Sequence, residues 1–270
     1  MLELEHGFRV VDVHTRLSTA EEGVTERGRA IGPENLEREI HQAGVVKAVV
    51  YPGSVEGNYL RANNAVARMS VERPFVAFAR INGALDADAR LGARVRNLTA
   101  RRKDHHTSPE DVERYAYDDR FNGFMLDPSA DGIPDTEVVE QLADVSLPLL
   151  VRGGESFPPS AVAEAFLDWD VPVILAHFGG HPLNRGLMDE AISLLDDYES
   201  LYLDTSFVRY RGQLERAIRE HPDRVLFGSG APDTHPNVSV MEILTLDVPE
   251  DAMARVFSKN PSRVIDALAP

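Results

Sequence analysis

The sequence predicts a single TIM barrel, the (β/α)8 architecture of the α/β class, and three observations support this prediction. Eight short apolar runs rich in β-branched residues alternate with helical patterns along the chain. Several of these runs are continuously apolar, as expected for parallel strands that helices cover. No linker rich in Gly, Ser or Pro divides the 270 residues, a length close to that of one such barrel. We therefore expect one domain over residues 1–270.

The predicted strands and helices follow one another in the order that this fold requires. The strands span residues 8–14, 45–51, 75–81, 121–126, 148–152, 171–177, 201–206 and 224–229. The helices span residues 33–42, 136–145, 160–169, 184–198 and 213–221. The first helix opens with Pro33 and Glu34, and its apolar Leu36 and Ile40 are spaced by one helical turn.

One segment, residues 82–120, is too long for a simple connection between a strand and a helix. We expect it to contain one helix around residues 90–102 and another around residues 109–117. Two interpretations stay open for this excursion: a lid over the mouth of the barrel, or a surface loop without a role. His105 and His106 lie there among charged residues, and we interpret them as part of a solvated turn.

Composition excludes several classes of partner and site. The 44 acidic and 28 basic residues give a net charge of -16, which argues against nucleic acid or an anionic membrane as a partner. The chain has no run of 18 apolar residues and no secretory signal at its start, so we expect a cytoplasmic protein. It has no cysteine, which leaves His, Asp, Glu and carboxylated Lys as metal ligands.

The basic residues are almost all arginine, since only Lys47, Lys103 and Lys259 are lysines. An acidic, lysine-poor chain suggests a halophile-like protein from an acidic proteome. In molar salt the Debye length is only about 3 Å, so a dense negative surface repels itself weakly. A genome rich in arginine codons is the alternative explanation.

Polar residues gather where the predicted strands end. Six of the eight strands finish in polar or ionisable side chains, among them Asp12, His14, Arg152, His177 and Asp204. The carboxyl ends of the strands of a TIM barrel converge on one mouth, where the reacting residues of such enzymes lie. Because polar side chains are costly to bury, their concentration at one end favours function over packing.

Seven motifs resemble a known family in their order and spacing. They are VVDVHTR, GFMLDP, PLLVRGG, VILAHFGG, LYLDTS, RVLFGSGAP and NPSRVI. Together they are similar to amidohydrolase-related family 2 of the amidohydrolase superfamily, which includes decarboxylases of the aminocarboxymuconate-semialdehyde decarboxylase kind. The resemblance covers nearly the whole chain and implies a metal-dependent TIM-barrel hydrolase or decarboxylase.

The chain departs from the family pattern at the metal ligands. His14 matches the first histidine of the Asp-x-His-x-His motif, and His177 matches the strand 6 histidine. Arg16, Arg152 and Gly230 stand where the family has two further histidines and the strand 8 aspartate. Met125 and Asp127 replace a lysine and a histidine of many members, so a carboxylated-lysine bridge is absent. The resemblance thus implies a metal centre that is reduced or lost.

A catalytic zinc needs about three protein ligands and an open position, and the two histidines alone are too few. Asp233 and His235 are the nearest candidates for a third ligand, ahead of the alternatives Asp12, Asp127 and His181. Arg16 and Arg152 are permanent cations in or beside this site, and they repel a divalent ion. Zinc or another divalent metal, and a site without metal, therefore both remain open.

The arginines suggest an anion-binding pocket. Two guanidinium groups about 6 Å apart repel by roughly 3 kcal/mol at an effective dielectric of 20, so an anion is expected between Arg16 and Arg152. Arg209 and Arg211 follow strand 7 and add positive charge to the same rim. Such a pocket would bind a small anionic substrate or ligand. Alternatively, Arg16 and Arg152 form salt bridges within the protein.

Three hypotheses for function follow. The first is a hydrolase or carbon-carbon lyase that acts on a small carboxylate-bearing substrate, with His177 as general acid or base and Asp12 and Asp204 orienting it or balancing its charge. The second is a non-catalytic relative that binds an anionic metabolite. The third, a purely structural scaffold, does not explain the polar mouth. A homo-oligomer is expected, although no motif specifies one.

Overall fold

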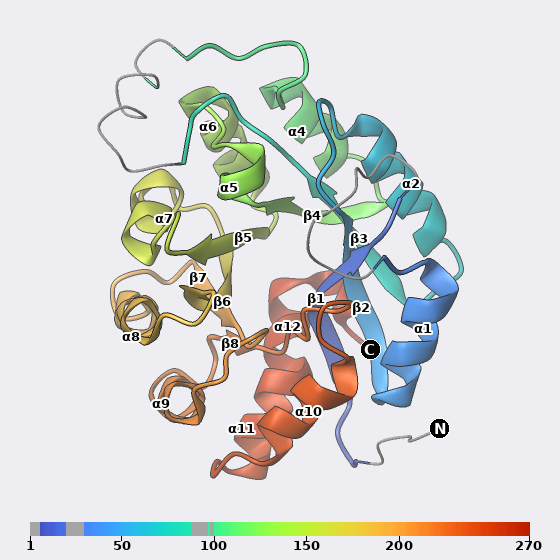
Figure 1. Ribbon diagram of the computed structural model, residues 1–270, viewed down its shortest axis with the longest axis vertical. Coiled ribbons are helices and arrows are strands. Elements are labelled where there is room, and N and C mark those ends of the chain that lie inside the picture. Colours follow the sequence, from blue (N-terminus) through green and yellow to red (C-terminus); the bar gives the residue numbers. More distant parts are fainter. Residues whose placement is uncertain (1–5, 20–29, 88–96, 98–99) are drawn as a thin grey trace.

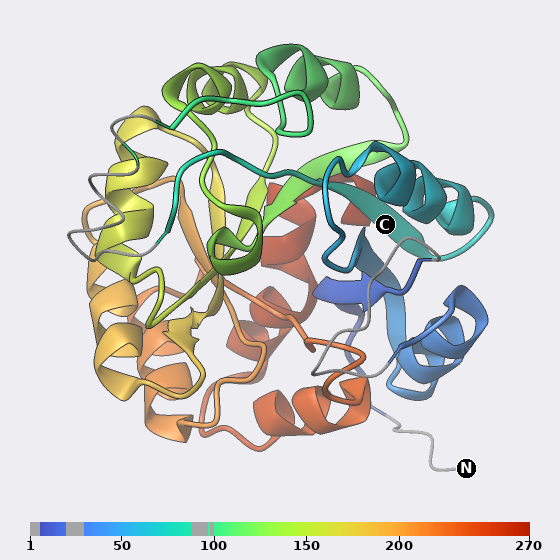
Figure 2. The same ribbon diagram turned by 45° about the horizontal axis from the view of Figure 1, so that its top comes forward.

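Eight parallel strands form one sheet in chain order, β1 to β8, with helices around its outside (Figures 1 and 2). The structure is a computed structural model, and it describes residues 6–19, 30–87, 97 and 100–270. The strands are β1 (Val10–Leu17), β2 (Val45–Pro52), β3 (Phe75–Arg80), β4 (Phe121–Leu126), β5 (Leu149–Gly154), β6 (Val173–His181), β7 (Leu201–Asp204) and β8 (Val225–Leu226). Each overlaps one predicted strand, and the predicted TIM barrel is confirmed.

Hydrogen bonds between β1 and the segment around and after β8 close the barrel. The backbone N–H of Val13 donates to Phe227 O at 2.9 Å, and that of Arg16 donates to Ala231 O at 2.8 Å. In the opposite direction, Gly230 N donates to His14 O at 3.0 Å. The end of the first strand and the loop after the last strand are therefore held side by side.

Helices form the outer ring. They are α1 (Pro33–Gln42), α2 (Leu60–Ser70), α4 (Pro109–Ala116), α5 (Pro128–Asp131), α6 (Thr136–Val145), α7 (Pro159–Ala165), α8 (Arg185–Leu194), α9 (Arg211–Glu220), α10 (Pro236–Leu244), α11 (Glu250–Ala254) and α12 (Asn260–Val264). The predicted helices at 33–42 and 136–145 coincide with α1 and α6, and the other three overlap α7, α8 and α9. The sequence patterns did not predict α2, α5 or α10 to α12.

Part of the excursion at residues 82–120 belongs to the wall of the barrel. Its second predicted helix is α4, which Ser108 begins with a capping box and whose Val112 is fully buried. This helix packs against α6 in the outer ring. Most of the first predicted helix, at residues 90–102, lies outside the described residues. Coverage of the mouth by this excursion therefore stays a prediction.

Apolar side chains fill the inside of the barrel, and a cavity remains at the carboxyl ends of its strands. Alternate residues of the strands, such as Val11, Val13 and Phe78, form an interior cluster. The cluster continues into Ile265 and Leu268 near the C-terminus. Leu268 O accepts a hydrogen bond from Arg9, which directly precedes β1, so this segment lies at the amino end of the strands. A second, larger apolar cluster lies between the strands and the helices. No helix within the described ranges is long and apolar enough to cross a membrane.

Candidate active site

A cavity of about 860 Å³ lies at the carboxyl ends of the strands. Residues from β1 to β6 and from the loops after β7 and β8 line it. They are His14, Arg16, Tyr51, Gly53, Ser54, Arg80, Met125, Asp127, Ala130, Arg152, His177, His181, Phe207, Gly230, Ala231, Pro232, Asp233 and His235. The polar strand ends thus meet around one cavity of a size that suits a small ligand.

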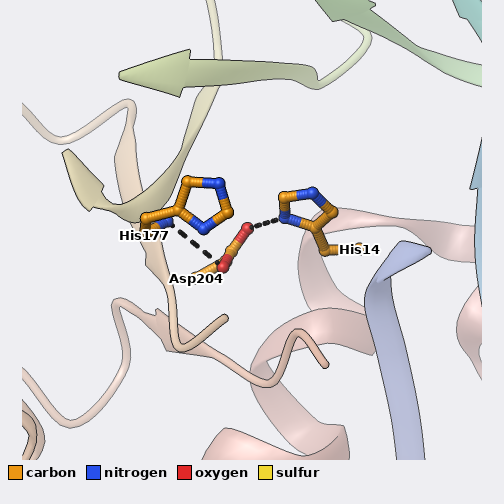
Figure 3. Close-up of side chains that lie close together, drawn as sticks. All are labelled: His14, His177 and Asp204. Carbon is orange, nitrogen blue, oxygen red and sulfur yellow. Dashed lines mark hydrogen bonds and ion pairs between the residues drawn. The ribbon is translucent and has the colours of Figure 1, made fainter. Parts of the chain in front are cut away.

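Two histidines and an aspartate form a buried cluster at the base of this cavity (Figure 3). His14 Nδ1 lies 2.6 Å from Asp204 Oδ2. The other oxygen, Asp204 Oδ1, accepts hydrogen bonds from the backbone N–H groups of Ser206 at 2.7 Å and His177 at 3.4 Å. Asp204 is completely buried, and the two histidines are 5% and 2% exposed. The aspartate therefore lies behind the imidazoles, away from solvent.

The Ser206 hydroxyl joins the three side chains. It donates a hydrogen bond to Asp204 Oδ1. Its Oγ is also 3.1 Å from His14 Nδ1 and 2.8 Å from His177 Nδ1. His177 Nδ1 lies 3.1 Å from the backbone carbonyl oxygen of Ser206 as well. Ser206 is fully buried and does not line the cavity, which argues against a nucleophilic role.

Left-handed backbone conformations concentrate at the strand ends that carry this cluster. His177, Phe178 and Phe207 have φ values of 60°, 50° and 56°. Such conformations cost a non-glycine residue on the order of 1 kcal/mol or more, and they gather at functional sites. Strain at three positions beside the cluster supports a functional interpretation of it.

Burial and hydrogen bonding set the charges of these groups. Burial, reinforced by His14, lowers the pKa of His177 to about 3, so this imidazole is neutral near pH 7. Burial alone would raise the pKa of Asp204, but His14 and the hydrogen bonds outweigh it and hold that pKa below its usual value. Asp204 is therefore an anion, and the neutral His177 keeps a ring lone pair that can accept a hydrogen bond or bind a cation.

Asp12 links the backbone of β1 to the loop that follows β8. Its Oδ1 accepts hydrogen bonds from the backbone N–H groups of His14 at 3.0 Å and Ser229 at 2.9 Å. Burial raises the pKa of Asp12 to about 6, although these hydrogen bonds oppose the shift. Asp12 does not line the cavity. Asp12 thus holds the backbone of His14 and Ser229, whereas the sequence suggested that it orients His177 or balances its charge.

Two of the predicted arginines reach the cavity. Arg152 Nη1 donates to Asp127 Oδ2 at 3.1 Å, and Arg152 Nη2 lies 3.5 Å from His181 Nε2. Arg16 Nη2 is 3.7 Å from Asp233 Oδ1. The Arg152 side chain remains 41% exposed, and a guanidinium has five N–H donors. Arg152 therefore combines a partner in the protein with donors that can face a ligand.

A third arginine in the cavity, Arg80, was not predicted. It ends β3, where its Nε donates to Asp131 Oδ2 at 2.9 Å and its Nη2 donates to Asp131 Oδ1 at 3.2 Å. Tyr59 donates to the same carboxylate at 2.6 Å. The sequence signal was a charged residue inside the otherwise apolar run FVAFARI. Because Asp131 occupies Nε and Nη2, and the Pro52 carbonyl accepts from Nη1 at 3.2 Å, Arg80 has few free donors for a ligand.

The other two predicted arginines lie outside the cavity lining. Arg209 pairs with Glu242 of α10, and Arg211 Nε donates to Glu215 Oε1 at 2.7 Å within α9. Both arginines are exposed. The expected rim of four arginines is thus replaced by two of them together with Arg80.

Among the described residues, one group of side chains has the composition and spacing to hold a metal ion. His14, His177 and Asp204 offer ligand atoms that all lie within 4.8 Å of one another. The predicted third ligands Asp233 and His235 line the cavity but do not belong to this group. His235 Nδ1 instead accepts a hydrogen bond at the start of α10.

A closed parallel barrel with ionisable residues at its carboxyl mouth defines a TIM-barrel enzyme. The chain belongs to the amidohydrolase family, because the sequence model of the Amidohydrolase family matches residues 11–266. This result confirms the resemblance. No curated protein matches the chain significantly.

Similar solved structures include aromatic acid decarboxylases. The 2,6-dihydroxybenzoate decarboxylase from Rhizobium has a TM-score of 0.65 and 14% identity, over 95% of this chain and 98% of that one. The 5-carboxyvanillate decarboxylase from Novosphingobium aromaticivorans, with manganese and 4-hydroxy-3-methoxy-5-nitrobenzoic acid, has a TM-score of 0.67 and 14% identity, over 97% and 98%. The dihydroxybenzoic acid decarboxylase from Polaromonas, with manganese and 2-nitroresorcinol, has a TM-score of 0.67 and 13% identity, over 97% and 98%.

Proposed function

We propose that this protein is a carbon-carbon lyase of the amidohydrolase family that decarboxylates a small, carboxylate-bearing substrate. The observation that carries this proposal is the placement of cavity arginines beside the buried cluster of His14, His177 and Asp204. The decarboxylases among the similar structures favour decarboxylation over hydrolysis. Hydrolysis is the second reaction that family membership supports.

The arginines supply the recognition of the substrate. Arg152 is the main anchor, because its side chain is 41% exposed and a guanidinium can donate two parallel hydrogen bonds to a carboxylate. Arg16 and Arg80 line the same cavity, where each is paired with an aspartate, Asp233 and Asp131 respectively. The donors of Arg152 are therefore the part of the mouth best placed to bind a small anion.

The histidines supply the proton chemistry. Decarboxylation breaks the bond between a carbon atom and its carboxylate, releases CO2, and requires a proton at that carbon. In a site without an ion, His14 is suited to carry this proton, because its Nδ1 is held 2.6 Å from the Asp204 carboxylate. Burial keeps His177 neutral and weakly basic, which favours a role as a ligand or hydrogen-bond partner over the general acid or base that the sequence suggested.

The donor set fits a divalent ion. His14 and His177 would hold zinc or manganese, together with Asp204 or a substrate oxygen. The ion would act as a Lewis acid on an oxygen of the substrate. The three nearby arginines weaken the attraction for such an ion, so we expect a lower affinity than the full family ligand set would give.

Metal analysis and a decarboxylation assay test this proposal together. We expect about one divalent ion per chain by plasma mass spectrometry, and CO2 release from at least one member of a panel of hydroxybenzoates and dicarboxylates. His14→Ala should abolish both. His221→Ala should change neither, because this histidine directly follows α9, pairs with Asp196 and does not line the cavity. A folded, ion-loaded protein that several carboxylates stabilise but that turns over none would instead establish the non-catalytic binder.

Other expectations from the sequence stay predictions. They are a cytoplasmic location, self-association, and the lack of nucleic-acid or membrane partners that the net charge of -16 suggests.

A further inference from the structure

We infer that Asp204 and the backbone carbonyl of Ser206 are positioning groups that fix His14 and His177 as Nδ1–H tautomers. Both imidazoles would then present the lone pair of Nε2 for binding a cation or accepting a proton. The inference concerns hydrogen positions within the cluster, and it rests on the proposed function only for what the Nε2 atoms bind.

The Ser206 hydroxyl has a single proton to donate but three neighbours. Its oxygen contacts Asp204 Oδ1, His14 Nδ1 and His177 Nδ1. An ionised carboxylate only accepts, so the hydroxyl proton goes to Asp204. The Ser206 oxygen is then an acceptor toward both imidazoles, and each Nδ1 must carry a hydrogen.

Contacts that do not involve the hydroxyl lead to the same assignment. His14 Nδ1 is 2.6 Å from Asp204 Oδ2, a distance at which two lone pairs would repel. His177 Nδ1 is 3.1 Å from the Ser206 carbonyl oxygen, which also only accepts. A carboxylate fixes one tautomer and a backbone carbonyl fixes the other.

This arrangement has the form that metal-binding histidines take. Such histidines donate their second ring N–H to a carboxylate or a backbone carbonyl, which orients the ring and raises its basicity. Both oxygens of Asp204 already accept hydrogen bonds from the protein. Asp204 therefore supports His14 from behind, and the coordination position that it would otherwise fill is left to water or substrate.

Nitrogen NMR of the ion-free protein tests the tautomers directly. With 15N-labelled histidine, long-range correlation spectra distinguish a protonated from an unprotonated ring nitrogen. We expect a protonated Nδ1 and an unprotonated Nε2 for His14 and His177, at a pH where both are neutral. An Nε2–H tautomer at either residue would overturn the inference for that residue, whatever the enzymatic activity.

Two substitutions locate the cause. In Asp204→Asn, the N–H of Ser206 keeps the amide oxygen on its side, so the amide NH2 faces His14 and should convert it to the Nε2–H tautomer. His177 should not change. Ser206→Ala retains the carbonyl and Asp204, so both tautomers should persist. An unchanged His14 in a folded Asp204→Asn protein would contradict the role of Asp204, and if this variant does not fold, the wild-type spectrum still decides.

Zinc binding separates this inference from the proposed function. Competition with a chromogenic chelator should show zinc affinity about 10- to 100-fold lower in Asp204→Asn, as expected when the partner of a ligand is removed. If Asp204→Asn converts His14 to the Nε2–H tautomer but leaves zinc affinity unchanged, the result would support the tautomer assignment. It would count against ion binding in the proposed function. Nδ1–H tautomers in a protein without turnover would likewise separate the two.

Discussion

Arg152 shows how one side chain can have both a structural partner and a ligand to bind. Its ion pair with Asp127 leaves the side chain 41% exposed beside the cavity. Charge-assisted hydrogen bonds of this kind contribute about 1.5–3 kcal/mol, so we expect Arg152→Gln to weaken binding of a carboxylate substrate or inhibitor by about 10- to 100-fold. Isothermal titration calorimetry or the KM would measure this loss, and Arg152→Lys should recover part of the affinity.

The matched control for this prediction is Arg211→Gln. Arg211 is an equally charged side chain, but it pairs with Glu215 on the exposed surface of α9. Its replacement should leave carboxylate affinity within about twofold, since exposed ion pairs contribute little. Equal effects at both positions would mean that overall charge, and not the cavity, attracts the anion.

Single residues also show what the sequence could and could not predict. The placement of His14 and His177 at the cavity followed from their positions at strand ends. The contact between His14 and Asp204, which are 190 positions apart, depends on the closed barrel and has no local signal. Arg209 and Arg211 were placed at the mouth by proximity to a strand, but the chain turns at Phe207 and carries them outward.

At the level of elements, the loop after β8 leaves little room for a side chain at Gly230, where the resemblance implied an aspartate. Gly230 has a φ of +72°, and a Cβ atom added there would lie 2.3 Å from Cε2 of Phe207. We expect Gly230→Asp, which restores the family residue, to lower the free energy of unfolding by about 1–3 kcal/mol through backbone strain and crowding. It should add no bound metal. Urea unfolding and metal analysis would measure both effects.

Gly212→Asp is the corresponding control, since a Cβ atom there has open space in the first turn of α9. An acidic residue at that end of a helix is favourable or neutral. Greater metal affinity in Gly230→Asp, with stability unchanged, would show that the loop can accept the family ligand after all.

The strands were easier to predict than their ends. The apolar runs located all eight, yet β1 continues to Leu17 and β6 to His181, beyond the predicted limits of 14 and 177. Arg16 pairs with Tyr51 of β2, and His181 pairs with Gly154 of β5. Backbone pairing does not require apolar side chains, so the barrel extends through the polar residues and holds them at defined positions.

For the whole molecule, the charge balance predicts a dependence of stability on salt. The net charge is -16, and many arginines already pair with acidic residues at the surface. The remaining negative charges repel one another over distances that salt shortens, since the Debye length falls from about 10 Å at 0.1 M to about 3 Å at 1 M. We expect the free energy of unfolding to rise steadily as KCl is increased to molar concentrations, as measured by urea titration.

A variant with fewer surface charges tests whether repulsion causes this rise. Glu140→Gln, Asp144→Asn and Glu164→Gln remove three negative charges from exposed positions on α6 and α7. Because less repulsion is left to screen, this protein should gain less stability from KCl and be more stable than the wild type at low salt. If both proteins gain equally, salt acts through apolar burial or ion binding, and the arginine content then reflects codon usage. A wild type with no gain at all would remove the case for salt adaptation.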